Sequence, residues 1–598
     1  MENGEKSNTP SRIRRFFAFL SAGYSVRTAT DRTRQERTRL RTARTLALWQ
    51  KTHLRRILCR LRDTLFMTEL RALALFLAPM ALAATFRCLL LPLLTDDFPL
   101  LPYDGAAGVL LLLLSLLLST YKTPLYRAVT EDRLLSHLCF STLALPRPYI
   151  TMARGIGGLW LFLLGLLPAA LSVFISPFLL TMILLGALLL VLTFASPEFA
   201  LLLLGGFFPL SILSEDPFLP LGIVLTVTLL SYLFKLLLGK RDFHLEPIGF
   251  FLLVFVAINL IFSYSGSPST FLAPLKLGVV AICGYFLTQN LLATKHTAVL
   301  FSRGMIFSAT LLSALAIFSE IFTLLPAHIE QGRITRYLLA LNARFFPSGD
   351  ILAAYLILLL PLLIGLLADS KEARLRLIPA LLILLAALVL SISPLALVAL
   401  ILALVLFTML STGSRAGLFF LLTAVLPNAI LLLPQGLCDR IASLIPVLGI
   451  DRMMSERLAL LRASLATVTE HPFGLGVGAA EGASLYLGIG MQSGIPGMLA
   501  LIAMLAFMAR DALRTTGLEG SNRHRTLPHG CACSLFAVLI YAPFQNIFAD
   551  IRIALLFFLM AGMLTAVCRI GWLEDEFHRR HMQDDDHQSY ATELRVEH

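Results

Sequence analysis

The chain has 598 residues, of which 57% are hydrophobic and only 14% are charged, and its mean hydropathy is +0.80. This composition excludes a soluble globular protein, and the long leucine-rich runs exclude a membrane β-barrel, whose strands are short and alternate in polarity. We therefore expect an all-α, polytopic integral membrane protein with about 14–16 transmembrane helices.

Residues 1–70 hold many arginines and lysines and few acids, and they contribute strongly to the formal net charge of +12. No nucleic-acid-binding motif accompanies these charges, so no nucleic acid is expected as a partner. We interpret the segment as a basic cytoplasmic arm that contacts the anionic headgroups of membrane lipids beside the first membrane helix.

Apolar runs long enough to cross a bilayer follow along the chain. We expect spans near 71–94, 105–121, 155–175, 178–195, 198–213, 217–238, 247–264, 272–292, 304–326, 350–368, 377–393, 395–411, 417–435, 495–509, 530–546 and 551–569. They divide into an N-terminal bundle, 71–326, and a second membrane domain, 327–570, with a large outer loop at about 436–493 that carries an amphipathic helix.

The charges of the connecting loops predict the orientation of these spans. Segments such as 236–247 and 368–377 carry lysine or arginine, whereas 93–105 and 214–220 are acidic. Since basic loops stay on the cytoplasmic side, both termini are predicted to be cytoplasmic, including the tail at 571–598.

The apolar run 377–411 is too long for one span, because a single helix of this length would measure about 50 Å. Ser391, Ser393 and Pro394 lie in its middle and favour a turn between two helices. This division places the GSRAG stretch, with Arg415, on the cytoplasmic side.

Two predicted outer loops are rich in arginine, against the usual charge distribution. They carry Arg333, Arg336 and Arg344 in the first loop, and Arg440, Arg452, Arg457 and Arg462 in the second. Guanidinium groups match phosphate oxygens well, so an anionic ligand at the outer face would explain them. The alternative is local salt bridging, since Asp451 precedes Arg452 and Glu456 precedes Arg457.

The second loop contains a predicted amphipathic helix over 451–470, in which Leu458, Leu461, Leu465 and Val468 recur at helical spacing. Pro472 ends this helix, and the glycines of HPFGLGVG allow a tight turn. A nucleotide-binding loop is rejected because no strand precedes these glycines.

The stretch SERLALLRASLATVTEHPFGLGVG, followed by QSGIPGMLALIAMLAFMAR, resembles the O-antigen ligase/polymerase family of bacterial envelope glycan enzymes. The upstream stretch NARFFPSGDILAAYLILLLPLLIGLL is similar to the family's outer segment, with Asp350 where asparagine is common. The residues that match the family pattern are Arg457, Pro472, Gly476, Gly478, Gly494, Ile495 and Gly497.

This resemblance implies a glycosyltransferase in the bacterial cytoplasmic (inner) membrane. Such an enzyme takes a glycan from undecaprenyl pyrophosphate at the outer face and needs no metal or cofactor. Arg457 is then the leading candidate for contact with the pyrophosphate, and His471 is a candidate general base. Further candidates for pyrophosphate binding are Arg333, Arg336, Arg344, Arg452 and Arg415.

The chain departs from the family pattern at two places. Ala483 and Ser484 stand where the family often has a His-Asn pair. The family's Ser-Arg-Gly element matches GSRAG by letters, but it matches SISPLAL (391–397) by topology, where Pro394 replaces the arginine.

Two other functions remain open from the sequence. A transporter or flippase of a lipid-linked or amphipathic substrate would suit the many glycines and prolines within the spans. A noncatalytic membrane scaffold is the third reading. The eight cysteines are scattered, so neither a metal site nor a disulfide framework is expected.

Overall fold

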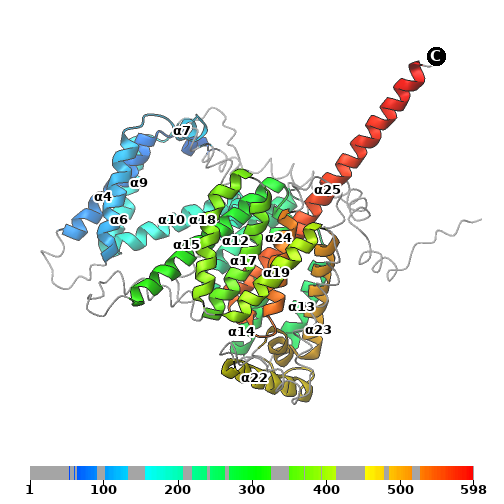
Figure 1. The fold of residues 1–598 in the computed structure, drawn as a ribbon. Coiled ribbons are helices and arrows are strands. Elements are labelled where there is room, and N and C mark those ends of the chain that lie inside the picture. Colours follow the sequence, from blue (N-terminus) through cyan, green and yellow to red (C-terminus); the bar gives the residue numbers. More distant parts are fainter. Residues whose placement is uncertain are drawn as a thin grey trace, which may run out of the picture. The chain divides into compact units, whose positions relative to one another are not determined.

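The fold is all-α, as the composition predicts (Figure 1). The computed structural model describes residues 53, 60, 63–89, 102–131, 136, 155–206, 218–238, 241, 243–262, 268–324, 349–369, 371–391, 393–412, 451–476, 484–514 and 526–596. These residues form 17 α-helices and one short 3-10 helix, without an extended β-strand. Eight of the helices are long and apolar enough to cross a membrane, and shorter apolar helices accompany them.

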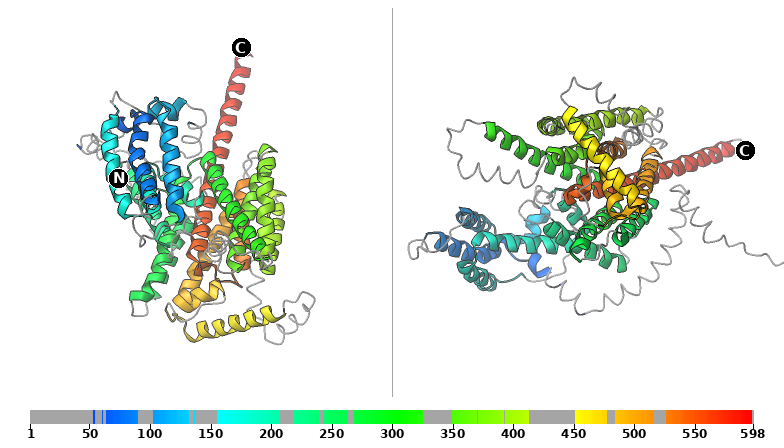
Figure 2. Two further views of the ribbon diagram at one scale, coloured as in Figure 1. Left: turned by 90° about the vertical axis from the view of Figure 1, so that its left-hand side faces the viewer. Right: turned by 90° about the horizontal axis from the view of Figure 1, so that it is seen from below.

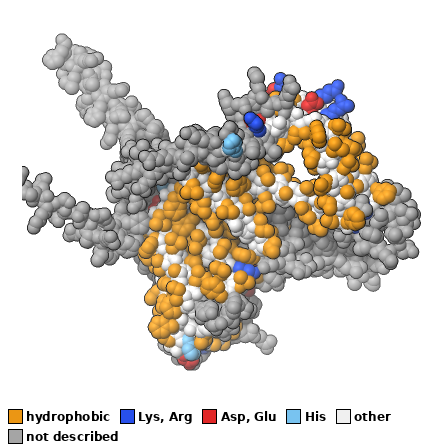
Figure 3. All heavy atoms as spheres, turned by 180° about the vertical axis from the view of Figure 1, so that it is seen from behind, with side chains coloured by type: hydrophobic (Ala, Val, Ile, Leu, Met, Phe, Trp, Pro, Cys, Tyr) orange, Lys and Arg blue, Asp and Glu red, His pale blue; other side chains and the backbone are white. Residues whose placement is uncertain are grey.

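Hydrophobic side chains cover most of the described surface on the face shown in Figure 3. Trp160, Phe174 and Leu382, for example, are each more than 60% exposed. An exposed apolar surface of this extent is stable only against lipid. The chain is therefore a polytopic helical membrane protein.

The chain forms two compact units. Unit 2 comprises 36–200 and 230–241, and unit 1 comprises 1–35, 201–229 and 242–598. The division of the chain near residue 326 stays a prediction.

Unit 2 is built on three closely packed helices, α4, α6 and α9. Its helices are α4 (Leu70–Leu89), α6 (Pro102–Ser119), α7 (Leu125–Glu131), α9 (Gly158–Phe174), α10 (Pro177–Ala195), the start of α11 (Pro197–Gly206) and the end of α12 (Phe218–Leu237). Small residues allow the close approach: a Cβ at Gly165 would overlap the backbone of Phe76, and one at Gly108 would lie 3.3 Å from Ala84 Cβ. The buried Arg87 donates from Nη1 to the carbonyl oxygen of Ser172 (3.1 Å), near the end of α9.

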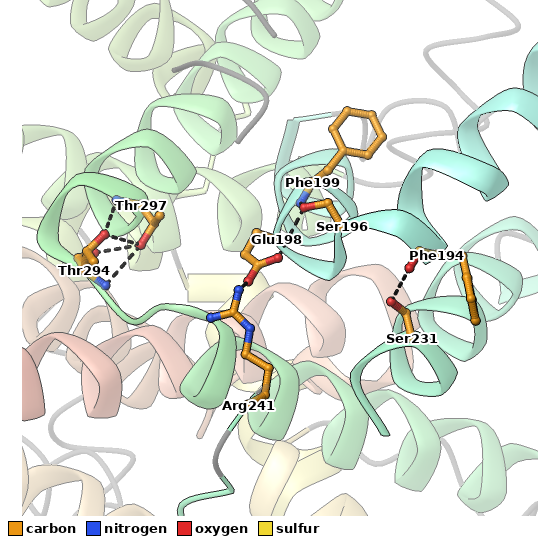
Figure 4. Close-up of polar contacts among 8 residues, drawn as sticks. All are labelled: Phe194, Ser196, Glu198, Phe199, Ser231, Arg241, Thr294 and Thr297. Carbon is orange, nitrogen blue, oxygen red and sulfur yellow. Dashed lines mark hydrogen bonds and ion pairs between the residues drawn. The ribbon is translucent and has the colours of Figure 1, made fainter. Parts of the chain in front are cut away.

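An ion pair joins the start of α11 to the segment after α12 (Figure 4). Glu198 lies in the first turn of α11, where a helix favours negative charge. Its carboxylate contacts the guanidinium of Arg241 and accepts a hydrogen bond from Ser196 Oγ (3.2 Å). A hydrogen bond from Ser231 Oγ to the carbonyl oxygen of Phe194 (2.6 Å) joins α12 to α10.

Arg241→Ala is expected to lower the free energy of unfolding by about 1–3 kcal/mol, because Glu198 loses its charged partner. The Glu198 side chain is only 15% exposed, so water compensates poorly. Arg127→Ala is the matched control, because its ion pair with Glu131 is 63% and 71% exposed, and it should cost at most about 0.5 kcal/mol. Thermal unfolding in detergent measures both changes, and equal losses would contradict this assignment.

Unit 1 is a larger bundle whose innermost helices are α17, α24 and α25. Its helices are α13 (Pro247–Phe262), α14 (Pro268–Leu291), α15 (Lys295–Leu324), α17 (Gly349–Asp369), α18 (Lys371–Leu390), α19 (Pro394–Thr412), α22 (Asp451–Glu470), α23 (Leu485–Arg514), α24 (Thr526–Tyr541), η7 (Ile547–Ala549) and α25 (Ile551–Val596). Gly365 and Gly530 let α17 and α24 meet, since a Cβ at Gly365 would lie 3.0 Å from Gly530 Cα.

The apolar run 377–411 is two helices, as predicted, and α19 begins at Pro394. Ser393, just before α19, contacts Tyr541 at the end of α24, with 3.3 Å between the two hydroxyl oxygens. Phe407, near the end of α19, contacts the ring of His529 near the start of α24. The two helices are therefore antiparallel, and α19 carries the chain from one end of the bundle to the other.

We name the end of unit 1 at Ser393 and Tyr541 the α22 end, because α22 also packs there. At the opposite end, Arg569 of α25 donates from Nη2 to the carbonyl oxygen of Gln289 in α14 (2.8 Å). The fully buried Asp511 accepts from Arg510 Nη2 (2.9 Å) at that end. The buried Arg569 thus ties α25 to the end of α14, whereas the Arg510–Asp511 pair lies within α23.

Candidate functional site

The predicted amphipathic helix is confirmed as α22, which lies across the ends of the bundle helices rather than alongside them (Figure 2). Leu461 and Val468 are buried in a cluster with Leu487 and Met491 of α23, and Leu465 and Phe544 pack against it. Burial of this stripe fixes α22 at the end of unit 1.

The helical repeat separates the arginines of α22 by face. Arg457 falls on the same stripe as Leu461, Ser464 and Val468, which are buried. Arg452 falls on the opposite stripe, with the exposed Glu470. Of the two, the position of Arg457 therefore faces the body of unit 1.

Arg462 is a further arginine of α22, which the sequence analysis placed among the loop arginines but not among the candidate site residues. Its Nη2 atom is buried and makes no hydrogen bond to the described part of the chain. A buried guanidinium nitrogen without a partner is costly, so this atom marks a place where an anion would be stabilised.

The two glycine-rich motifs of the sequence meet at a break in α23. The helix leaves helical geometry at Gly494 (φ 73°, ψ −173°), which divides it into a buried first part and a longer second part. The loop after α22 covers this break: Leu475 N–H donates to the Met491 carbonyl (2.8 Å) and Gly476 N–H to the Gln492 carbonyl (3.1 Å). In return, Ile495 N–H donates to the Pro472 carbonyl (2.8 Å).

Both sides of this contact require glycine. Gly474 (φ 85°) and Gly494 (φ 73°) adopt positive φ values that residues with a side chain rarely take. A Cβ at Gly474 would lie 2.5 Å from the carbonyl oxygen of Gln492, and one at Gly494 would overlap the backbone of Pro472 and Phe473. The HPFGLG and SGIPG motifs are therefore two halves of one structural element.

A buried hydroxyl pair holds a carboxylate beside this element. Asp350, in the first turn of α17, accepts hydrogen bonds on Oδ1 from Tyr541 Oη (2.9 Å) and Ser393 Oγ (3.1 Å). Tyr541 and Ser393 are almost fully buried, whereas Asp350 is partly exposed. A Cβ at Gly349 would overlap the carbonyl oxygen of Ser391, so α17 begins directly against the turn before α19.

This cluster is continuous with the broken helix. The carbonyl oxygen of Ala542, one residue after Tyr541, accepts from the backbone N–H of Leu485 (2.9 Å) and from Ser484 Oγ (3.3 Å). Ser484, one of the two positions that the sequence resemblance aligns with a His-Asn pair, joins α23 to the end of α24. Asp550 and Arg552 form a further ion pair at the start of α25 (2.5 Å).

The sequence-predicted site residues divide into three groups. His471 is exposed at the α22 end, and its carbonyl accepts from Gly474 N–H (2.9 Å) in the turn of the loop. Arg452 and Arg457 lie on α22. Outside the described residues lie Arg333, Arg336, Arg344 and Arg415.

Sequence reasoning missed the partnership of Asp350, Ser393 and Tyr541. Asp350 stood out only as a departure from the usual asparagine, and Ser393 only as a turn former. Tyr541 lies in a predicted span, and no local pattern relates it to a residue 191 positions earlier. Within the described ranges, no group of three histidine, cysteine or acidic residues is placed to hold a metal ion.

The α22 end thus combines an amphipathic helix bearing arginines, a glycine-locked break in a helix and an oriented carboxylate. Such a set is suited to binding an anionic group and accepting a proton. Comparison of the chain with family models, curated proteins and solved structures finds no match in any of the three.

Proposed function

We propose that this protein is a membrane glycosyltransferase of the O-antigen ligase or polymerase type. It would transfer or polymerise a glycan from an undecaprenyl-pyrophosphate carrier at the outer face of the bacterial cytoplasmic membrane. In this proposal the α22 end is the outer end of unit 1, both termini are cytoplasmic, and lipids of the membrane contact the basic N-terminal arm.

One observation carries the proposal: the HPFGLG loop and the SGIPG break contact each other. These are the motifs on which the family resemblance rests, and 17 residues lie between Gly476 and Gly494 along the chain. Their contact explains the glycines of both motifs, because Gly474 and Gly494 allow the two backbones to approach each other. It also sets them beside α22 and the Asp350 carboxylate, where charged groups are available for chemistry.

The expected chemistry needs a cation and a base. When the sugar–phosphate bond breaks, negative charge develops on the pyrophosphate, and a nearby guanidinium stabilises it. Arg457 is our first candidate for that role because it falls on the inward stripe of α22. Arg462 adds a buried nitrogen that makes no hydrogen bond to the residues that the structure describes.

A transporter or flippase is the second candidate function. The break in α23 favours it, because discontinuous helices often form the binding sites of transporters. Here the carbonyls of Met491 and Gln492 at the break accept hydrogen bonds from the HPFGLG loop. Fewer backbone carbonyls are therefore left to bind a transported ion.

Reconstitution into liposomes separates the two functions. With an undecaprenyl-pyrophosphate-linked oligosaccharide as the probe, we expect the protein to release undecaprenyl pyrophosphate and to transfer the glycan. Protein-free liposomes with the same lipid are the control. Movement of the intact lipid-linked glycan between leaflets, without release of the carrier, would contradict the transferase and support the transporter.

A further inference from the structure

We propose that Asp350 is the general base of the glycosyl transfer, and that Tyr541 and Ser393 are positioning residues that orient its carboxylate. This inference rests on the proposed function and names the residue that would replace the family's histidine. It differs from the expectation from sequence, which gave that role to His471.

The geometry around Asp350 is that of an oriented base. Two buried hydroxyls converge on Oδ1, at 2.9 Å for Tyr541 in α24 and 3.1 Å for Ser393 in the turn before α19. The hydroxyls also lie 3.3 Å from each other, so the three groups form a closed triangle. A carboxylate has about four lone-pair sites on two oxygens, and both of these bonds are accepted by Oδ1.

The position of Asp350 suits it to meet a substrate. It belongs to the first turn of α17, where the helix dipole stabilises a negative charge. The residue is partly exposed, whereas both of its hydroxyl partners are buried. The carboxylate is therefore held by buried hydroxyls in a residue that is itself partly exposed.

His471 is placed differently. Its side chain is exposed, and its backbone serves the turn that leads into the HPFGLG loop. A general base works best when its own orientation is fixed, and Asp350 has that support from two side chains.

The acceptor hydroxyl oxygen forms a bond to the anomeric carbon of the donor, and its proton passes to the Asp350 carboxylate. The bond from the anomeric carbon to the phosphate oxygen breaks, and its electron pair leaves with undecaprenyl pyrophosphate. The proton on Asp350 then returns to water.

The test compares Asp350→Asn with wild-type protein and with Glu470→Gln in the same liposomes. The probe is the undecaprenyl-pyrophosphate-linked oligosaccharide, and the readout is the rate of carrier release as a function of pH. Asparagine keeps the size of the side chain and an acceptor oxygen for Tyr541 and Ser393, but it cannot take a proton. Glu470→Gln removes the charge of an exposed carboxylate at the same end.

For Asp350→Asn we expect kcat to fall about 10²- to 10⁴-fold with little change in KM. The residual rate should rise with pH as hydroxide replaces the missing base, and Glu470→Gln should keep the wild-type rate and pH profile. A wild-type kcat and pH profile in Asp350→Asn would overturn the inference and leave the proposed function standing. A folded wild-type protein that releases no carrier would instead overturn the proposed function, and the inference with it.

If Asp350→Asn fails to fold, the double variant Tyr541→Phe with Ser393→Ala answers the same question. It keeps the carboxylate and removes both hydroxyls that orient it. We expect kcat to fall about 10- to 100-fold, with KM and melting temperature close to wild type, because the base is present but misdirected. An unchanged kcat would overturn the positioning role and the inference.

Discussion

Gly494→Ala is expected to disrupt the α22 end and to abolish activity. At φ 73° and ψ −173°, the residue occupies a region that is essentially restricted to glycine, and the dihedral strain alone costs about 1–3 kcal/mol. The added Cβ would also lie 2.6 Å from Phe473 Cα and would overlap the carbonyl oxygen of Pro472. Because both neighbours are backbone, neither can move without separating the loop from the helix.

Thermal unfolding in detergent and release of the carrier lipid together check this result. Gly186→Ala, in α10, is the matched control because a Cβ there meets nothing within 4 Å. Alanine is favoured over glycine in a helix by about 1 kcal/mol, so the control should melt at or above the wild-type temperature. Wild-type melting and activity in Gly494→Ala would show that the break does not depend on this glycine.

Arg457→Ala is expected to lower kcat/KM for carrier release about 10²- to 10³-fold, the usual cost of removing one group that stabilises developing charge. Arg457→Lys should recover only part of the rate, because lysine is a point charge and cannot bind phosphate oxygens in a bidentate manner. Arg452→Ala should lose less, since that position falls on the outward stripe of the same helix.

Arg303→Ala is the matched control for these arginine variants. Arg303 is exposed on α15 and belongs to none of the groups that we assign to the site. The amount of each variant in the membrane must be measured beside its rate, because an arginine also affects orientation. Equal losses of kcat/KM in Arg457→Ala and Arg303→Ala would contradict the assignment of Arg457 to pyrophosphate binding.

The sequence by itself determined the fold class and much of the helix pattern. Apolar runs of bilayer length leave no stable alternative to membrane helices, because backbone groups in lipid must find partners within the chain. The same reasoning divided 377–411 at Pro394 and ended α22 before Pro472, since proline lacks the N–H that a helix interior needs. Periodicity alone also identified the buried stripe of α22 at Leu461 and Val468.

Part of α23 escaped prediction. The sequence indicates a span that begins at 495, whereas the helix starts at Leu485 and contains a break at Gly494. Gly488, Gly490 and Gly494 weaken a helical signal read from the sequence, because glycine is a poor helix former. Burial against α22 and α24 supplies the missing stability, and burial is a property of the assembled bundle.

Only the tertiary structure decided which polar groups meet. Asp350, Ser393 and Tyr541 come from three separate segments, and each looks ordinary in its own segment: a helix start, a turn former and a residue in an apolar span. Likewise, the sequence displays the glycines of HPFGLG and SGIPG as two separate motifs, while their hydrogen bonds join them into one. Local pattern indicates which segments are helical, but convergence on one carboxylate oxygen depends on how the helices pack, which no single segment encodes.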